Sequence, residues 1–174
     1  IRTFMKNSIS MLPANRKENS VIPDLTIMEN FVTAEHALSS KKQFIKPLED
    51  KEKYLKEKNR LKIKADNEEN PISSLSGGNQ QKVFLARWLN TQSEVLLLDN
   101  PTQGVDVGAK SEIYHLMNEL VAAGKSIIMI SSEMTEILRM SDRIIVMCEG
   151  RVTGEIGIEE ATQERIMHAA TLRK

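Results

Sequence analysis

Two short segments carry the side chains with the clearest chemical potential. In the first, the apolar run 95–98 ends on Asp99 and Asn100. Open α/β sheets bind ligands at the carboxyl ends of their strands, and a carboxylate placed there commonly holds Mg²⁺, directly or through water. A strand also often ends on Asp because Asp favours turns. Asp99 is therefore a candidate metal ligand, with an ordinary turn residue as the alternative.

The second segment reads SSLSGGNQQKVFLARWLN and spans residues 73–90. Gly77 and Gly78 free the backbone to offer N–H groups, and Ser76 adds a hydroxyl at the start of a helix predicted from about Asn79 to Leu89. The unpaired N–H groups and the positive dipole end of such a helix suit a phosphate. The alternative is an ordinary Ser-Gly-Gly loop in which the serine caps the helix.

An alternation of strands and helices is expected to position these residues. Strands are predicted at 94–99, 126–131 and 143–148, with helices at about 107–123 and 134–140 between them. The longer helix carries apolar residues three and four apart, and Gly124 ends it. That stripe consists of Ile113, Leu116, Met117, Leu120 and Val121. Continuous apolar strands separated by helices predict an α/β fold with a parallel sheet covered on both faces.

The flanking regions are less regular. A turn is predicted at Pro23 and Asp24, a helix start at Thr26, a turn at 149–150 and a last helix at about 158–172. More than half of residues 41–70 are charged, which predicts a solvated helix or a linker. The apolar residues of that charged segment are too sparse to predict a deep core face: Leu48, Tyr54, Leu55, Leu61 and Ile63.

Composition excludes several functional classes. The 174 residues include 24 Lys plus Arg and 24 Asp plus Glu, so the net charge is zero. That balance offers no electrostatic argument for a nucleic-acid partner, and none is expected. The single cysteine, Cys148, excludes an internal disulfide. The longest apolar runs fall far short of the roughly 20 residues that a membrane-spanning helix needs.

The order of the motifs resembles the nucleotide-binding domain of an ABC transporter. LSGGNQQK stands about twenty residues before LLLDNPTQGVD, and IIMISSEM and SDRIIVMCEGRV follow. These segments are similar to the signature motif, Walker B with the D-loop, and the last core strands. The resemblance is to the second ATPase half of ribose/galactose-type sugar importers and runs from about Leu12 to the C-terminus. It implies a partial P-loop NTPase fold, with a parallel sheet, flanking helices and a helical subdomain.

The resemblance also implies domain boundaries and residue roles. Residues 1–33 would form a Q-loop-like segment, 34–74 a charged helical subdomain, and 75–174 the signature, Walker B, D-loop and C-terminal part of the core. In such proteins two ATPase halves close around two nucleotides. The implied nucleotide-binding residues are Ser76, Gly77, Gly78, Asn79 and Asp106. Ser76, Gly77 and Gly78 would contact the γ-phosphate of the ATP held by the partner half. Asp99 would serve Mg²⁺ at this half's own site.

Three positions bear on catalysis. Asn100 stands where the family has its general-base Glu, and Ala14 stands where it has the Q-loop acid. Ser132 occupies the switch position, as is usual for this second half. No intact catalytic set is therefore expected at the chain's own site.

The sequence contains no G-x-x-x-x-G-K-[ST] phosphate loop. The tripeptide Gly124-Lys125-Ser126 has Glu119 where the first glycine should be, and it joins a helix to a strand, the reverse of a P-loop. The resemblance therefore implies the C-terminal part of one ATPase half, with the P-loop on residues before Ile1. Such a chain should be inactive alone.

The function implied is a fragment of the ATP-hydrolysing subunit of a sugar importer, with ATP and Mg²⁺ as ligands in the full-length protein. Its own site would be degenerate, whereas its signature would serve the partner site. The implied partners are another ATPase half, fused or separate, transmembrane permease subunits and, indirectly, a periplasmic or lipoprotein sugar-binding protein. The implied location is the cytoplasmic face of the bacterial membrane. A catalytically silent regulatory half and a soluble, non-transport ABC ATPase remain as alternatives.

Overall fold

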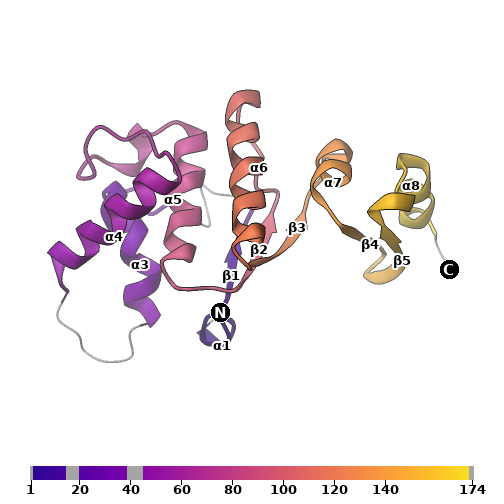
Figure 1. The fold of residues 1–174 in the computed structure, drawn as a ribbon, viewed down its shortest axis with the longest axis horizontal. Coiled ribbons are helices and arrows are strands. Elements are labelled where there is room, and N and C mark those ends of the chain that lie inside the picture. The colour runs from indigo at the N-terminus through magenta and orange to yellow at the C-terminus, as the bar shows by residue number, and fades with distance from the viewer. Residues whose placement is uncertain (1, 15–19, 39–44, 173–174) are drawn as a thin grey trace. The chain divides into compact units, whose positions relative to one another are not determined.

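The computed structural model describes residues 2–14, 20–38 and 45–172. The chain divides into two compact units, Ile1–Ile130 and Ser131–Lys174. The first unit contains the elements from α1 to β3 in Figure 1, and the second contains those from α7 to α8. The candidate residues of the first unit therefore depend on its own packing.

A three-stranded parallel sheet lies in the first unit. Its strands are β1 (Ile9–Leu12), β2 (Val95–Asp99) and β3 (Ser126–Ile130), in the order β1-β2-β3. The predicted parallel pairing of the strands at 94–99 and 126–131 is confirmed. Strand β1 was not predicted, because four residues that include a serine carry too little periodicity. Its pairing with β2 makes β2 the central strand.

The two faces of this sheet differ in burial. Leu12, Leu96 and Leu98 are 1% exposed and lie on one face. On the other face Ile128 and Ile130 are 56% and 58% exposed. Helix α5 contacts β1 and α6 contacts β3, so the buried face is the one that helices cover. The face that carries Ile128 and Ile130 is exposed, and its coverage by further helices stays a prediction.

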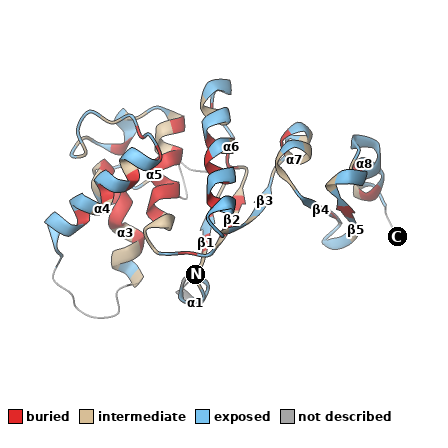
Figure 2. Cartoon of the chain, viewed as in Figure 1, coloured by how far each residue is buried: buried red, intermediate tan, exposed pale blue. Residues whose placement is uncertain are grey.

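Helices form the rest of the first unit. They are α1 (Arg2–Lys6), α3 (Ile27–Leu38), α4 (Pro47–Arg60), the short 3₁₀ helix η1 (Ile72–Ser74), α5 (Gly77–Leu89) and α6 (Val107–Ala122). Figure 2 shows buried residues along α3 and α5, which pack against each other. The predicted helix start at Thr26 is confirmed, because its hydroxyl accepts from Glu29 N while the Glu29 carboxylate accepts from Thr26 N. This reciprocal pair is a capping box.

Helix α6 follows the predicted stripe except at its last member. Ile113, Leu116, Met117 and Leu120 are buried, whereas Val121 is 48% exposed. Gly124 ends the helix segment with a φ of 86°, a left-handed conformation that glycine adopts without steric cost.

The charged segment is less solvated than its composition predicts. Tyr54 is 0% exposed, and Leu61 and Ile63 are each 4% exposed. The Tyr54 ring meets Phe31 of α3 edge to face, with centroids 5.7 Å apart. Only Leu48 of the predicted surface residues is strongly exposed, at 80%. Helix α4 therefore buries one aromatic anchor in a contact with α3 that sequence spacing does not reveal.

Arg87 links α5 to α3 and to Ser20, which precedes α3. Its guanidinium donates to the backbone carbonyls of Ser20 and Asn30 and to the Asn30 side-chain oxygen. It also lies 5.0 Å from the centre of the Phe84 ring. Burial lowers the pKa of Arg87 to about 10. These neutral acceptors hold the C-terminal part of α5 against α3 and against Ser20.

The second unit is an antiparallel hairpin with helices. It contains α7 (Met134–Met140), β4 (Arg143–Cys148), β5 (Arg151–Gly157), the 3₁₀ helix η2 (Ile158–Glu160) and α8 (Gln163–Ala170). Strand β4 was expected in the parallel sheet, but it pairs antiparallel with β5 in a separate sheet. The reason is the tight connection, in which Glu149 and Gly150 both have positive φ, as a two-residue hairpin requires.

A small apolar core holds the second unit together. Its buried members are Ile144, Val146, Ile156, Ile166 and Ala169. The predicted last helix is shorter than expected, since α8 begins only at Gln163 after η2. Across the ranges that the structure describes, every helix is too short or too polar to cross a bilayer.

Candidate functional site

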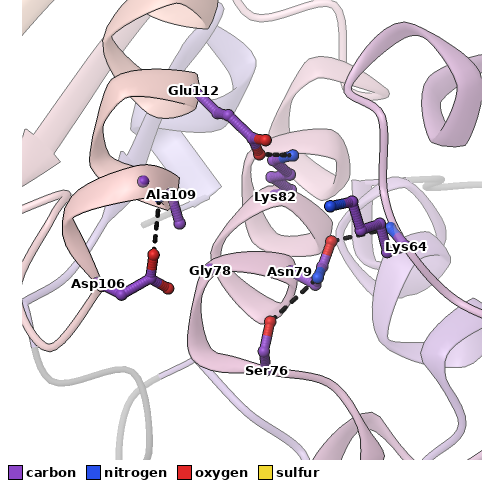
Figure 3. Close-up of a pocket in the computed structure, with 9 residues that line it drawn as sticks. Lys64, Ser76, Gly78, Asn79, Lys82, Asp106, Ala109 and Glu112 are labelled. Atoms are coloured by element: carbon purple, nitrogen blue, oxygen red, sulfur yellow. Dashed lines mark hydrogen bonds and ion pairs between the residues drawn. The ribbon is translucent and has the colours of Figure 1, made fainter.

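A cavity of about 310 Å³ lies between the start of α5 and the start of α6. Its lining includes Ser76, Gly78 and Asn79 from the signature-like segment and Asp106 from the D-loop-like segment. Lys64 contributes a further wall (Figure 3). The fold therefore brings together two motifs that are about thirty residues apart in the sequence.

Ser76 precedes α5 without capping it. Its side chain makes no capping hydrogen bond within the described part of the chain, although it stands at the N-cap position with an extended backbone. Its hydroxyl oxygen instead accepts from Asn79 Nδ2 at 3.0 Å. Ser76 therefore lacks the usual bond of an N-cap serine, which accepts from a backbone N–H of the first turn.

Gly78 allows a close approach of two helices. A Cβ at this position would lie 2.8 Å from Ala109 Cβ on α6, far inside ordinary carbon–carbon contact. Its φ is not positive, so the requirement is space and not a left-handed backbone. The second glycine of the signature-like segment is thus needed for packing of α5 on α6 at the cavity.

Charged groups of the cavity are partly neutralised by one another. Asp106 caps α6 by accepting from Ala109 N at 2.9 Å. Lys82 is buried, and its ammonium donates to Glu112 Oε2 at 2.6 Å and to the Lys62 carbonyl at 3.1 Å. That hydrogen bond from Lys82 lowers the pKa of Glu112. Lys64 Nζ contributes a cation to the exposed side of the cavity.

The end of β2 carries the second group of candidate residues. Asn100 follows Asp99 with a φ of 45°, a region in which Asn is far more common than most residues. Its backbone N–H donates to the Ile130 carbonyl at 2.7 Å, and its side-chain amide donates to Asp99 Oδ1 at 3.1 Å. Asn100 thus engages one oxygen of the neighbouring carboxylate and adds no charge.

The remaining predicted residues fall in different places. Ala14 lies two residues beyond β1, at the same sheet edge as Asp99, because Leu12 pairs with Leu98 in a parallel register. Gly77 is the first residue of α5. Ser132 is exposed and belongs to the second unit. The structure therefore groups Ser76, Gly78, Asn79 and Asp106 at one cavity and Ala14, Asp99 and Asn100 at one sheet edge.

Sequence reasoning missed the three charged cavity residues outside the two motifs. Lys64, Lys82 and Glu112 line the cavity, yet Lys64 lies in the segment interpreted as solvated and the other two resemble ordinary helix surface charges. The signal that could have indicated Lys82 is its position one helical turn after Gly78, on the same face of α5. Nothing comparable marks Lys64.

Asp99 is the metal ligand that the sequence predicts. Within residues 2–14, 20–38 and 45–172, no three His, Cys, Asp or Glu residues gather as a metal-binding group. A single carboxylate fits Mg²⁺, which proteins commonly hold through one or two carboxylates together with water and substrate phosphates. Asp99 therefore fits a magnesium site that depends on a bound polyphosphate.

Fold and motif order define a class, the ATP-binding cassette. The structure superimposes on a solved ATP-binding cassette of an ABC transporter with a TM-score of 0.77 and 24% identity, over 97% of this chain and 70% of that one. A dimeric cassette solved with ADP and phosphate gives a TM-score of 0.70 over 88% of this chain and 65% of that one, at 22% identity. These likenesses establish the fold as α/β with a parallel sheet and flanking helices.

The chain belongs to the ABC transporter family, whose sequence profile matches residues 1–103. It is 48% identical over 167 residues to the ribose import ATP-binding protein of Oceanobacillus iheyensis. The matched region covers 96% of this chain and 34% of that protein. It is also 48% identical to the xylose import ATP-binding protein of Thermoanaerobacter pseudethanolicus, over 96% of this chain and 33% of that protein. The chain thus spans about a third of the length of these curated relatives.

Proposed function

We propose that this chain acts as part of the ATP-binding subunit of a sugar-importing ABC transporter. Relatives at 48% identity that are named as ribose and xylose import ATP-binding proteins support this assignment. The observation that carries it is the shared cavity of Ser76, Gly78, Asn79 and Asp106, which joins the signature-like and D-loop-like segments. Through this surface the chain contributes to a nucleotide site completed by a partner ATPase half.

The signature-like segment serves the terminal phosphate of the ATP that the partner holds. A helix N-terminus attracts anions through its N–H groups and dipole, and α5 is thirteen residues long. Ser76 Oγ adds a hydroxyl donor beside Gly77, Gly78 and Asn79, with Asp106 on the facing segment. The absence of a Ser76 cap supports this role, since the hydroxyl is not committed to the helix backbone.

The chain's own site is proposed to be degenerate. Asp99 would hold Mg²⁺ there, and the ion would neutralise phosphate charge when ATP is bound. Asn100 cannot take a proton from water, because an amide is not a base at any physiological pH. General-base assistance contributes roughly 10²–10⁴ in rate. Ala14 offers no carboxylate at the neighbouring strand end, so hydrolysis at this site should be poor.

The test compares two substitutions in the full-length subunit assembled with its permease. Ser76→Arg should abolish most ATP turnover, because a bulky side chain would occupy the space of the terminal phosphate. Asn100→Ala should change turnover little, because little base function remains to remove. Equal damage by both substitutions would overturn the degenerate-site assignment and would mean that Asn100 orients water or couples the two sites.

A second candidate function is a catalytically silent, regulatory half. The bond from the Asn100 amide to Asp99 favours it, because that bond competes with metal ligation by the same oxygen. Equilibrium binding of Mg-ATP to the full-length protein separates the candidates. Loss of all binding at the site of Asp99 favours the silent half, whereas retained binding without hydrolysis favours the degenerate site. A soluble, non-transport ATPase would be favoured if the protein failed to bind any permease.

The partners follow from this assignment. Another ATPase half, fused or separate, would complete the nucleotide sites, and transmembrane permease subunits would receive the motion of the cassettes. A periplasmic or lipoprotein sugar-binding protein would deliver substrate to the permease. The subunit would then lie peripherally on the cytoplasmic face of the bacterial membrane. Copurification with the permease from solubilised membranes tests this placement.

A further inference from the structure

The cavity contains a short hydrogen-bond relay through Asn79. Lys64 N donates to Asn79 Oδ1 at 2.8 Å, and Asn79 Nδ2 donates to Ser76 Oγ at 3.0 Å. Figure 3 shows Asn79 between the other two residues, with Ser76 at the lower end of the relay. The start of α5 and the segment after α4 therefore meet at one amide.

The backbone donor decides which way the Asn79 amide points. A backbone N–H can only donate, so the atom that faces Lys64 N must be the carbonyl oxygen of the amide. The amino group then faces Ser76, and an amino group of an amide can only donate. Ser76 Oγ is consequently forced to accept from Asn79, and its own hydroxyl proton is directed elsewhere.

We propose that Asn79 is a positioning residue that keeps the Ser76 hydroxyl as a donor toward a terminal phosphate of ATP. The proposal rests on the proposed function of the signature-like segment and adds a role that the bare motif does not supply. A hydroxyl has one proton, so a serine that accepts from Asn79 can offer that proton to an anion. Hydrogen bonds to charged groups are stronger than neutral ones.

The same relay fixes the wall of the cavity. Asn79 ties the backbone at Lys64, which follows α4, to the first turn of α5. The Lys64 side chain therefore stays on the cavity, where it is one of the lining residues. Loss of the Asn79 side chain would remove both its hydrogen bond with the Lys64 backbone and its hydrogen bond to Ser76. A change confined to the amino group would remove only the hydrogen bond to Ser76.

Asn79→Asp makes the confined change. One oxygen of the introduced carboxylate still accepts from Lys64 N, but the other cannot donate to Ser76. The serine would then donate its proton to that second oxygen, and the terminal phosphate would lose it. The matched control is Asn67→Asp, since Asn67 Oδ1 also accepts a backbone N–H, from Glu69 at 3.0 Å, and Asn67 does not line this cavity.

The experiment measures binding of Mg-AMP-PNP, which has three phosphates, and of Mg-ADP, which has two. The protein is the full-length subunit with its partner half, and thermal unfolding is recorded for each variant. Asn79→Asp should weaken AMP-PNP binding about tenfold or more, because a hydrogen bond to a charged group is lost. ADP binding and thermal stability should change little, and Asn67→Asp should affect neither nucleotide.

A double-mutant comparison with Ser76→Ala separates this proposal from the proposed function. If Asn79 acts through the serine hydroxyl, Asn79→Asp in the Ser76→Ala background should weaken AMP-PNP binding much less than it does alone. If the double variant instead weakens AMP-PNP binding by the product of the two single fold-changes, the positioning role is wrong. The effect of Asn79→Asp is then one of charge alone. If Ser76→Ala itself leaves AMP-PNP binding unchanged, the assignment of the signature-like segment fails instead. Equal losses for ADP and AMP-PNP would also contradict the positioning role.

Discussion

Packing at Gly78 allows a quantitative test of how α5 and α6 form the cavity. In Gly78→Ala the new Cβ would meet Ala109 Cβ at 2.8 Å, whereas carbon atoms in good contact are about 3.5–4.0 Å apart. Overpacking of this kind costs about 1–3 kcal/mol, against which a helical Ala recovers roughly 0.5–1 kcal/mol relative to Gly. We therefore expect a net destabilisation of about 1 kcal/mol, with opening of the cavity.

Ala109→Gly removes the atom that would clash. Alone it should destabilise α6 by about 0.5–1 kcal/mol, because glycine is a poorer helix former. Combined with Gly78→Ala it should restore stability to near that of the unmodified protein, since the next nearest atom to the new Cβ is Val105 Cγ1 at 3.7 Å. The coupling free energy between the two substitutions should be about 1–3 kcal/mol in favour of the double variant.

Urea unfolding followed by fluorescence provides the assay, because Trp88 on α5 is the single tryptophan. Gly108→Ala is the matched control: it lies one residue from Ala109, its nearest contact would be 3.4 Å, and it should not destabilise the protein. If the double variant is no more stable than the sum of the single changes predicts, the close approach of α5 and α6 is not what Gly78 serves.

Four further predictions address stability and activity. Tyr54→Phe should raise the free energy of unfolding by about 1 kcal/mol, because the buried hydroxyl has no partner among the described residues. Burial raises the pKa of Tyr54 to about 12, so the unmodified protein should lose stability as pH rises above 10. The Phe variant should lose less over that range, as pH-dependent unfolding would record. Glu112→Gln should destabilise the protein near neutral pH by weakening the hydrogen bond from Lys82. Because the pKa of Glu112 is lowered, the difference in stability between the variant and the unmodified protein should shrink as pH falls below about 4. Acid titrations of unfolding measure this difference. The chain as given should self-associate through the open sheet face, and Ile128→Lys should reduce this in sedimentation, whereas a monomer that melts cooperatively well above about 60 °C would contradict the expectation. Phosphate release by this chain alone should stay negligible, and turnover near roughly 1 s⁻¹ would refute that prediction.

Local patterns in the sequence were sufficient to predict most helices and strands of the first unit. The apolar run before Asp99, the spacing from Ile113 to Leu120 and the positive-φ glycine at Gly124 each depend on neighbours within a few residues. The capping box at Thr26 is similarly local. The motif order from the signature-like segment to the D-loop-like segment also identified the fold class, because that order is a property of the sequence itself.

Tertiary packing decided what those local patterns could not. Burial of Tyr54 depends on Phe31 of another helix, and the open sheet face depends on which strands have helices against them, so neither has a signal in its own segment. Strand β4 has the apolar composition of a parallel strand, and only its observed pairing with β5 showed that the turn predicted at 149–150 closes an antiparallel hairpin. Lys64 and Asn79 became part of one cavity because α5 packs beside the segment after α4. The sequence by itself determined which residue types were available at each motif, whereas only the tertiary structure decided which of them share a site, because such contacts join residues that are distant along the chain.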